Sequence, residues 1–123
     1  MSKNSITKTS TIVDCVLLSG MALFHGSGII YVTELVQQSN AKPFIKEIFP
    51  VLFVHPSIHL LGLAALGILT LFMKYEIGKI LLFISILVFI NAVLAFFLNA
   101  TIPGILLILS AFIFGLAASK SAK

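Results

Sequence analysis

The three histidines are the residues best suited to chemistry in this chain. His55 and His59 are four residues apart, so on a helix they lie on one face, one turn from each other. Together with His25 they would offer three imidazole nitrogens to copper or zinc. His25 facing His59 from a second helix would suit a b-type haem. The sequence therefore predicts a candidate metal or haem site formed by His25, His55 and His59.

Asn91 belongs to the same predicted polar layer. His25, His59 and Asn91 each lie eight or nine residues from the expected outer end of their helix. At ~1.5 Å per residue, this places all of them about 12–13 Å below that end. The alternative is that each imidazole bonds to a neighbouring backbone carbonyl or to Asn91 and only fixes helix packing.

Other chemistries are excluded by the residues that the sequence lacks. A single cysteine, Cys15, excludes a disulfide framework within the chain and a thiolate-rich metal cluster. There is no C-x-x-C-H motif for a c-type haem, and no glutamate inside an expected span for a carboxylate-bridged di-iron site. Asp14 is expected at the inner membrane interface, solvated or paired with Lys8 or Lys79.

Long apolar runs form the elements that must position these residues. Hydrophobic residues make up 59% of the 123 residues and charged residues only 10%, whereas a soluble domain has about 25% charged residues. Crossing ~30 Å of hydrocarbon takes about 20 apolar residues in a helix. We therefore expect an all-α integral membrane protein, a single domain over residues 1–123. Its four transmembrane helices would form an antiparallel bundle, with spans at about 11–33, 50–73, 80–98 and 102–119.

The lysines indicate the orientation of these spans. The chain has eight basic residues, all of them lysines, and a net charge of +4. Six fall in the N-terminal tail, the middle loop or the C-terminal tail: Lys3, Lys8, Lys74, Lys79, Lys120 and Lys123. Only Lys42 and Lys46 fall on the other side. The positive-inside rule then predicts cytoplasmic N and C termini in the plasma membrane, and the basic charge does not indicate nucleic-acid binding.

The first outer loop carries a further helical signal. Within residues 42–49 the apolar side chains share one helical face, Pro43 suits a first helical turn, and Asn40 can cap it. We expect a short helix lying in the outer membrane interface. Pro56 is expected to kink the second span or to begin it.

A small accessory or structural subunit of a larger membrane complex is the first functional expectation. The sequence shows no nucleophile–base set, phosphate loop or nucleotide motif, and the last two spans are apolar on all sides, so they can face lipid or another subunit. We expect membrane lipids and other membrane subunits as partners, with Glu34 facing a partner and no catalytic activity in the isolated chain. An oxidoreductase-type assembly is expected by analogy alone.

Two alternatives come from other classes. One is a metal- or haem-binding membrane protein that uses the histidines, with copper or b-type haem as the cofactor. The other is a small transporter, because the length and the four spans are similar to the small multidrug resistance family. That family relies on a membrane-embedded Glu in its first helix and on aromatic residues including Trp. Here Asp14 and His25 occupy the first span and Trp is absent, so no family residue is carried over. The absence of arginine and the richness in isoleucine and phenylalanine are typical of an AT-rich prokaryotic genome.

Overall fold

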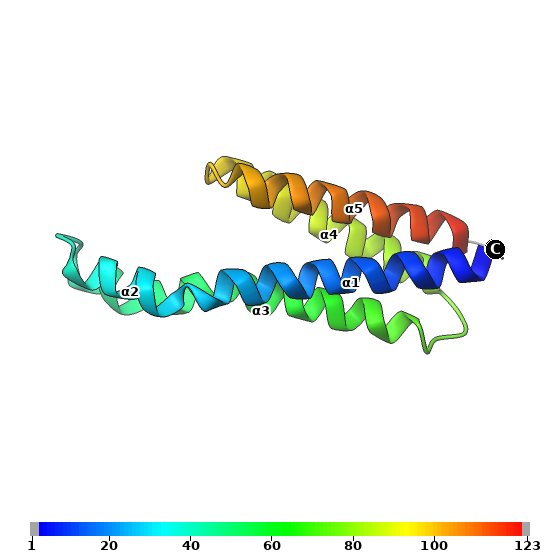
Figure 1. Cartoon of the computed structure of the whole chain (residues 1–123), viewed down its shortest axis with the longest axis horizontal. Coiled ribbons are helices and arrows are strands. Elements are labelled where there is room, and N and C mark those ends of the chain that lie inside the picture. Colours follow the sequence, from blue (N-terminus) through cyan, green and yellow to red (C-terminus); the bar gives the residue numbers. More distant parts are fainter. Residues whose placement is uncertain (1–2, 122–123) are drawn as a thin grey trace.

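The computed structural model describes residues 3–121, which form helices joined by short turns (Figure 1). The helices are α1 (Lys3–Ser27), α2 (Ile29–Gln38), α3 (Pro43–Thr70), α4 (Ile77–Phe97) and α5 (Thr101–Ser121). Four segments are long and apolar enough to cross a membrane: Ser5–Gln38, Pro43–Thr70, Ile77–Phe97 and Thr101–Ser121. The prediction of an all-helical chain with four such segments is confirmed.

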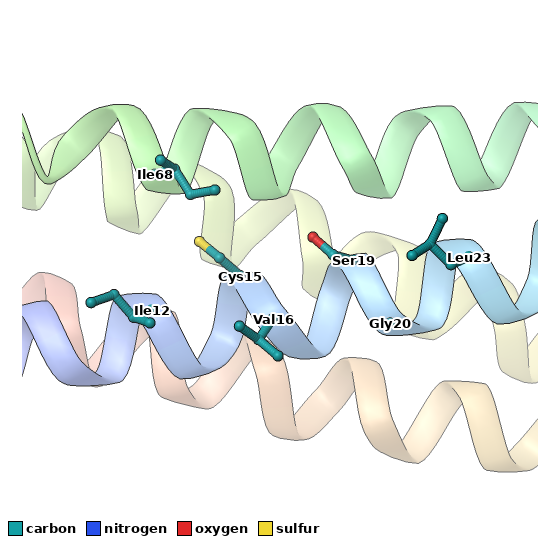
Figure 2. Close-up of a pocket in the computed structure, with 7 residues that line it drawn as sticks. All are labelled: Ile12, Cys15, Val16, Ser19, Gly20, Leu23 and Ile68. Atoms are coloured by element: carbon teal, nitrogen blue, oxygen red, sulfur yellow. The ribbon is translucent and has the colours of Figure 1, made fainter.

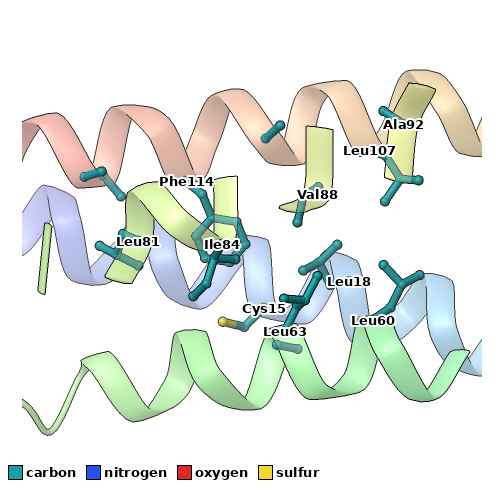
Figure 3. Close-up of a cluster of buried hydrophobic side chains, with 14 of the residues drawn as sticks. Cys15, Leu18, Leu60, Leu63, Leu81, Ile84, Val88, Ala92, Leu107 and Phe114 are labelled. Carbon is teal, nitrogen blue, oxygen red and sulfur yellow. The ribbon is translucent and has the colours of Figure 1, made fainter. Parts of the chain in front are cut away.

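One apolar core receives side chains from α1, α3, α4 and α5 (Figure 3). On α4 its members recur every three or four residues, at Leu81, Ile84, Val88 and Ala92, as on the buried face of a helix. Phe114 of α5 is the largest side chain that is fully buried. Many large apolar side chains on the opposite faces are exposed, as expected of helices that lipid surrounds.

The first hairpin is formed by α1 and α2 on one side and α3 on the other. Cys15 of α1 lies against Gly67 of α3, and further along α1 Gly26 lies against Ser57, so the two helices run in opposite directions. Gly28 is the only residue between α1 and α2. These two helices therefore form one nearly continuous arm alongside α3.

The second hairpin is formed by α4 and α5. The hydroxyl of Ser85 donates a hydrogen bond to the carbonyl of Ala111 across this pair (2.7 Å). Asn99 in the connecting turn has a φ of 57°, a left-handed conformation that asparagine adopts more readily than most residues. The hairpins meet mainly through α1 and α5, whereas α3 and α4 touch much less.

Residues 43–49 are helical, but they do not form the separate short helix that was predicted for residues 42–49. Those residues are the first turns of α3, which begins at Pro43 and continues through Pro50 and Pro56. Pro56 therefore does not begin the second span. The outer loop is reduced to residues 39–42, and Lys42, rather than Asn40, occupies the N-cap position, without a side-chain hydrogen bond.

Contacts from α2 explain how α3 continues through its first internal proline. Pro50 has no backbone N–H, so the carbonyl four residues earlier, that of Lys46, loses its donor within the helix. The side chain of Gln37 replaces it, because its Nε2 donates to the carbonyl oxygen of Lys46 (3.0 Å). Lys46 Nζ donates in return to the carbonyl oxygen of Gln37 (2.7 Å). The pair joins the outer ends of α2 and α3.

The two hairpins differ in length. At ~1.5 Å per residue, the 21 residues of α4 and of α5 each extend about 31 Å, the 28 residues of α3 about 42 Å, and the 34-residue α1–α2 segment about 51 Å. Figure 1 shows that the α4–α5 hairpin stops near the junction of α1 and α2. Residues 29–53, which we name the α2–α3 extension, continue beyond it.

Close packing at Gly67 provides a test of the first hairpin. A Cβ atom at Gly67 would lie 2.6 Å from Cys15 Sγ and 3.3 Å from the Phe114 ring. We expect Gly67→Ala to lower the free energy of unfolding by about 1–3 kcal/mol, the usual cost of overpacking. Chemical unfolding in detergent measures this change.

Gly62→Ala is the matched control, because a Cβ atom at Gly62 meets nothing within 4 Å. It is expected to be neutral or stabilising by up to about 1 kcal/mol, since alanine has the higher helix propensity. Replacing Cys15 with alanine in the Gly67→Ala variant should restore part of the lost stability. Equal effects of the two glycine substitutions would contradict the packing of α1 on α3.

Candidate functional site

His25 connects the end of α1 to the backbone of α3. Its Nε2 atom donates to the carbonyl oxygen of Phe53 (3.0 Å), and its ring stacks on the Phe53 ring with 4.4 Å between centroids. Because a carbonyl oxygen only accepts, Nε2 carries the proton in this arrangement. Phe53 lies three residues before Pro56, where a proline weakens the helical hydrogen bonding of α3. His25 thus supports α3 beside its second internal proline.

His55 and His59 lie one turn apart on α3, as their spacing predicts. Their ring centroids are 6.4 Å apart; His55 is exposed and His59 half-buried. Over residues 3–121 the structure shows no group of three or more His, Cys, Asp or Glu side chains that could hold a metal ion. The three histidines of the predicted metal site are therefore not gathered around one point, and His25 is directed to the Phe53 backbone.

Asn91 forms its hydrogen bond within its own helix rather than with a histidine. Its Nδ2 atom donates to the carbonyl oxygen of Leu87 within α4 (2.8 Å), and its side chain is half-buried. The predicted layer took its depth from the outer end of each helix. Because α1–α2 and α3 extend beyond α4 and α5, those ends are not level (Figure 1). Glu34 is exposed on α2, and its contact with a partner stays a prediction.

Asp14 departs most from its expected setting. The sequence predicted a solvated carboxylate, or one paired with Lys8 or Lys79, but the side chain is fully buried. Lys8 is exposed, and Lys79 forms an ion pair with Glu76 (2.6 Å). The expectation was wrong because Asp14 faces the interior of the bundle rather than its inner rim.

The buried surroundings of Asp14 form a polar cluster, which we call the Asp14 cluster: Asp14, Thr11 and Ser110. All three side chains are fully buried. Ser110 and the backbone of Phe114, both on α5, lie beside the carboxyl group. However, among the described residues neither carboxylate oxygen, nor the hydroxyl oxygen of Thr11 or Ser110, has a hydrogen-bond partner of good geometry.

This arrangement has a chemical consequence. A buried carboxylate without a counter-charge costs several kcal/mol, so such a group takes up a proton or a cation. A titratable group within a membrane span is also a functional-site candidate by default. The heptad-like spacing of Thr11, Asp14 and Leu18 was the signal in the sequence, because it places Asp14 on the core face of α1.

The fold and these polar groups define a class, a small all-helical membrane protein with one buried carboxyl group among its described residues. No protein-family model, no curated protein and no solved structure matches this chain. Function is therefore inferred from the chain itself.

The structural role of His25 gives a prediction. His25→Ala removes both the hydrogen bond to Phe53 and the ring stacking, so we expect the free energy of unfolding to fall by about 1–2 kcal/mol. His25→Phe keeps the stacking and should lose about half of that amount. His55→Ala, at an exposed position of α3, should change stability by less than about 0.5 kcal/mol.

Chemical unfolding in detergent compares the three histidine variants with the unmodified protein. Equal effects of His25→Ala and His55→Ala would show that the contact with Phe53 does not stabilise α3.

Proposed function

We propose that this protein is a small accessory subunit of a larger membrane complex, and that the α2–α3 extension is its contact with the partner subunits. The observation that carries this proposal is the exposed apolar surface of the extension, beyond the end of α4–α5. Its large exposed side chains are Ile30, Tyr31, Leu35, Phe44, Ile45, Val51 and Leu52. Exposed apolar surface of this kind marks a contact with protein or membrane.

The proposed placement in the plasma membrane follows from helix length and charge. The α4 and α5 helices, about 31 Å long, match the thickness of the hydrocarbon layer. The lysine-rich ends of the helices lie in the cytoplasm, so the bundle is antiparallel with both termini on that side. Of those lysines, Lys123 and the side chain of Lys3 lie outside the described residues. The α2–α3 extension then reaches the outer interface, with residues 43–49 among its interfacial residues.

The outward histidines support a protein partner over lipid alone. His55 is exposed on α3 and His59 half-buried, two and six residues after the extension ends at residue 53. Imidazole groups are costly against hydrocarbon, and membrane helices use such side chains for hydrogen bonds to a neighbouring helix. Glu34, exposed on α2, offers a further polar contact on the extension. We propose that the complex is an oxidoreductase assembly. The chains that co-purify with this protein will identify it.

Purification from native membranes tests this function. A tagged protein in mild detergent should retain other membrane chains, identified by mass spectrometry. Replacing Tyr31 and Phe44 together with alanine should reduce those chains about tenfold, because buried aromatic side chains dominate binding energy at interfaces.

The matched control replaces Phe83 of α4 and Phe112 of α5 with alanine, since both are exposed aromatic residues outside the extension. It should leave the retained chains unchanged. Equal losses in the two double variants, or a tagged protein that retains no other chain, would contradict the proposal.

A second candidate function, transport of a proton or small cation, is favoured by the Asp14 cluster. Its unpartnered oxygens lie inside a membrane-spanning helix, as in carriers that bind and release a cation at a buried carboxylate. Asp14→Asn should then abolish cation-dependent proton flux into proteoliposomes, measured with an enclosed pH-sensitive dye. Glu76→Gln, at an exposed carboxylate, should leave the flux unchanged. A flux that is absent in the unmodified protein, or unaltered by Asp14→Asn, rules this function out.

A further inference from the structure

A polar cavity lies at the lysine-rich end of the bundle, separate from the histidines and from the α2–α3 extension. Its volume is about 310 Å³, and it is lined by the start of α1, the end of α3, the segment that connects α3 to α4, and the start of α4. The side chains that give it its character are Thr7, Lys8, Thr11, Thr70 and Lys74. The cavity therefore brings two positive charges and three hydroxyl groups to one end of the first hairpin.

The charges in this cavity favour an anion. Lys8 and Lys74 are both exposed side chains that line it. Glu76, the acidic residue that follows Lys74 in the chain, is engaged in its ion pair with Lys79. Asp14 lies nearly one turn beyond Thr11, fully buried on the face towards α5. The two lysines thus face the cavity with no acidic side chain in its lining.

The hydroxyl group of Thr11 supplies a buried donor. Thr11 lines the cavity and is fully buried, and its hydroxyl oxygen has no hydrogen-bond partner among the described residues. Thr70 is different, because its hydroxyl already donates to the carbonyl oxygen of Gly67 (2.6 Å). An unpartnered buried hydroxyl is costly, and a phosphate oxygen is a strong acceptor for it.

An apolar groove begins one helical turn further along α1. Figure 2 shows it between α1 and α3, with Cys15, Ser19, Leu23 and Ile68 among its lining side chains. Its volume is about 370 Å³. From Ile12, one turn after Lys8, to Leu23, the groove follows α1 for roughly 16 Å towards the α2–α3 extension. Its apolar lining and its course along the helix suit a hydrocarbon chain.

We propose that the cavity and the groove together bind one anionic phospholipid. Its phosphate group lies between Lys8 and Lys74 and accepts a hydrogen bond from Thr11, and one acyl chain occupies the groove between α1 and α3. Basic cavities between membrane helices at the cytoplasmic surface recognise anionic headgroups in this way. The groove distinguishes a lipid from a soluble phosphate, which would use the cavity alone. This site is independent of the proposed accessory function, and it shares Thr11 with the Asp14 cluster.

Native mass spectrometry of the delipidated protein in neutral detergent tests the site. The probes are phosphatidylglycerol, phosphatidylcholine and glycerol 3-phosphate. Phosphatidylglycerol should bind as one retained molecule, more tightly than phosphatidylcholine, and its affinity should fall as salt is raised. Lys8→Gln with Lys74→Gln should weaken its binding about thirtyfold. The two lost charge contacts together amount to about 2 kcal/mol, and each 1.4 kcal/mol is a factor of ten in affinity.

Two further variants separate the parts of the proposal. Lys120→Gln removes a charge from the same end of the molecule but outside the cavity, leaves the ion pair of Glu76 and Lys79 intact, and should leave binding nearly unchanged. Gly20→Leu fills the groove at a position where a Cβ atom meets nothing within 4 Å, and should weaken the lipid without altering any charge.

Three results would overturn the site: equal binding of phosphatidylcholine and phosphatidylglycerol, equal losses in Lys120→Gln and in the Lys8 and Lys74 double variant, or binding of glycerol 3-phosphate as tight as that of the lipid. The last result would assign the cavity to a soluble phosphate instead.

Discussion

The continuous course of α3 through two prolines determines the length of the first hairpin. Pro50 and Pro56 each remove a backbone donor from a helix of 28 residues. Gln37 donates to the carbonyl of Lys46, which Pro50 leaves without its helical donor. His25 donates to the carbonyl of Phe53, the residue after Leu52, whose carbonyl loses its helical donor at Pro56. The α1–α2 arm therefore stabilises α3 as a helix, and α3 in turn holds α2 in line with α1.

Unequal hairpins follow from this constraint. With α3 unbroken from Pro43, the first hairpin extends past the 21-residue helices of the second. Its polar groups divide between two levels. His25 contacts Phe53, the last residue of the extension, and His55 and His59 follow within six residues, whereas Asp14 is buried beside α5. The proposed partner contact uses the α2–α3 extension and the histidines. The proposed cation and lipid sites use other residues, around Asp14 and the polar cavity.

The membrane-spanning helices were predictable from the sequence because long apolar runs have one stable solution in a bilayer. The turn at Asn99 was also predictable, since proline and glycine follow it closely. The helical conformation of the end of α2 was not predictable, because Glu34, Gln37 and Gln38 have the composition of a loop. Their helix is stabilised by contacts with α3, which come from a distant part of the chain.

The candidate sites were predictable only in part. The four-residue spacing of His55 and His59 predicted that the two side chains lie next to each other on α3. The partner of His25 is a backbone carbonyl, which has no sequence signature of its own. The spacing of Thr11, Asp14 and Leu18 places Asp14 on one face of α1, but the sequence does not show that this face meets Ser110 of α5, almost a hundred residues away. Local periodicity thus predicted which residues share a helix face but not which face meets another helix.

If α4–α5 spans the membrane, the turn at the tip of the α2–α3 extension lies outside the cell. Labelling with a membrane-impermeant maleimide in intact cells measures this, in a chain whose Cys15 is replaced by alanine. Asn40→Cys lies in the turn between α2 and α3, which is exposed and outside the apolar surface proposed to bind the partner subunits, and Phe89→Cys lies on α4, where the side chain is 51% exposed. We expect labelling at position 40 from outside the cell, and none at position 89 until the protein is denatured. Equal protection of the two positions would show that the tip of the extension does not project from the bilayer and would contradict this topology.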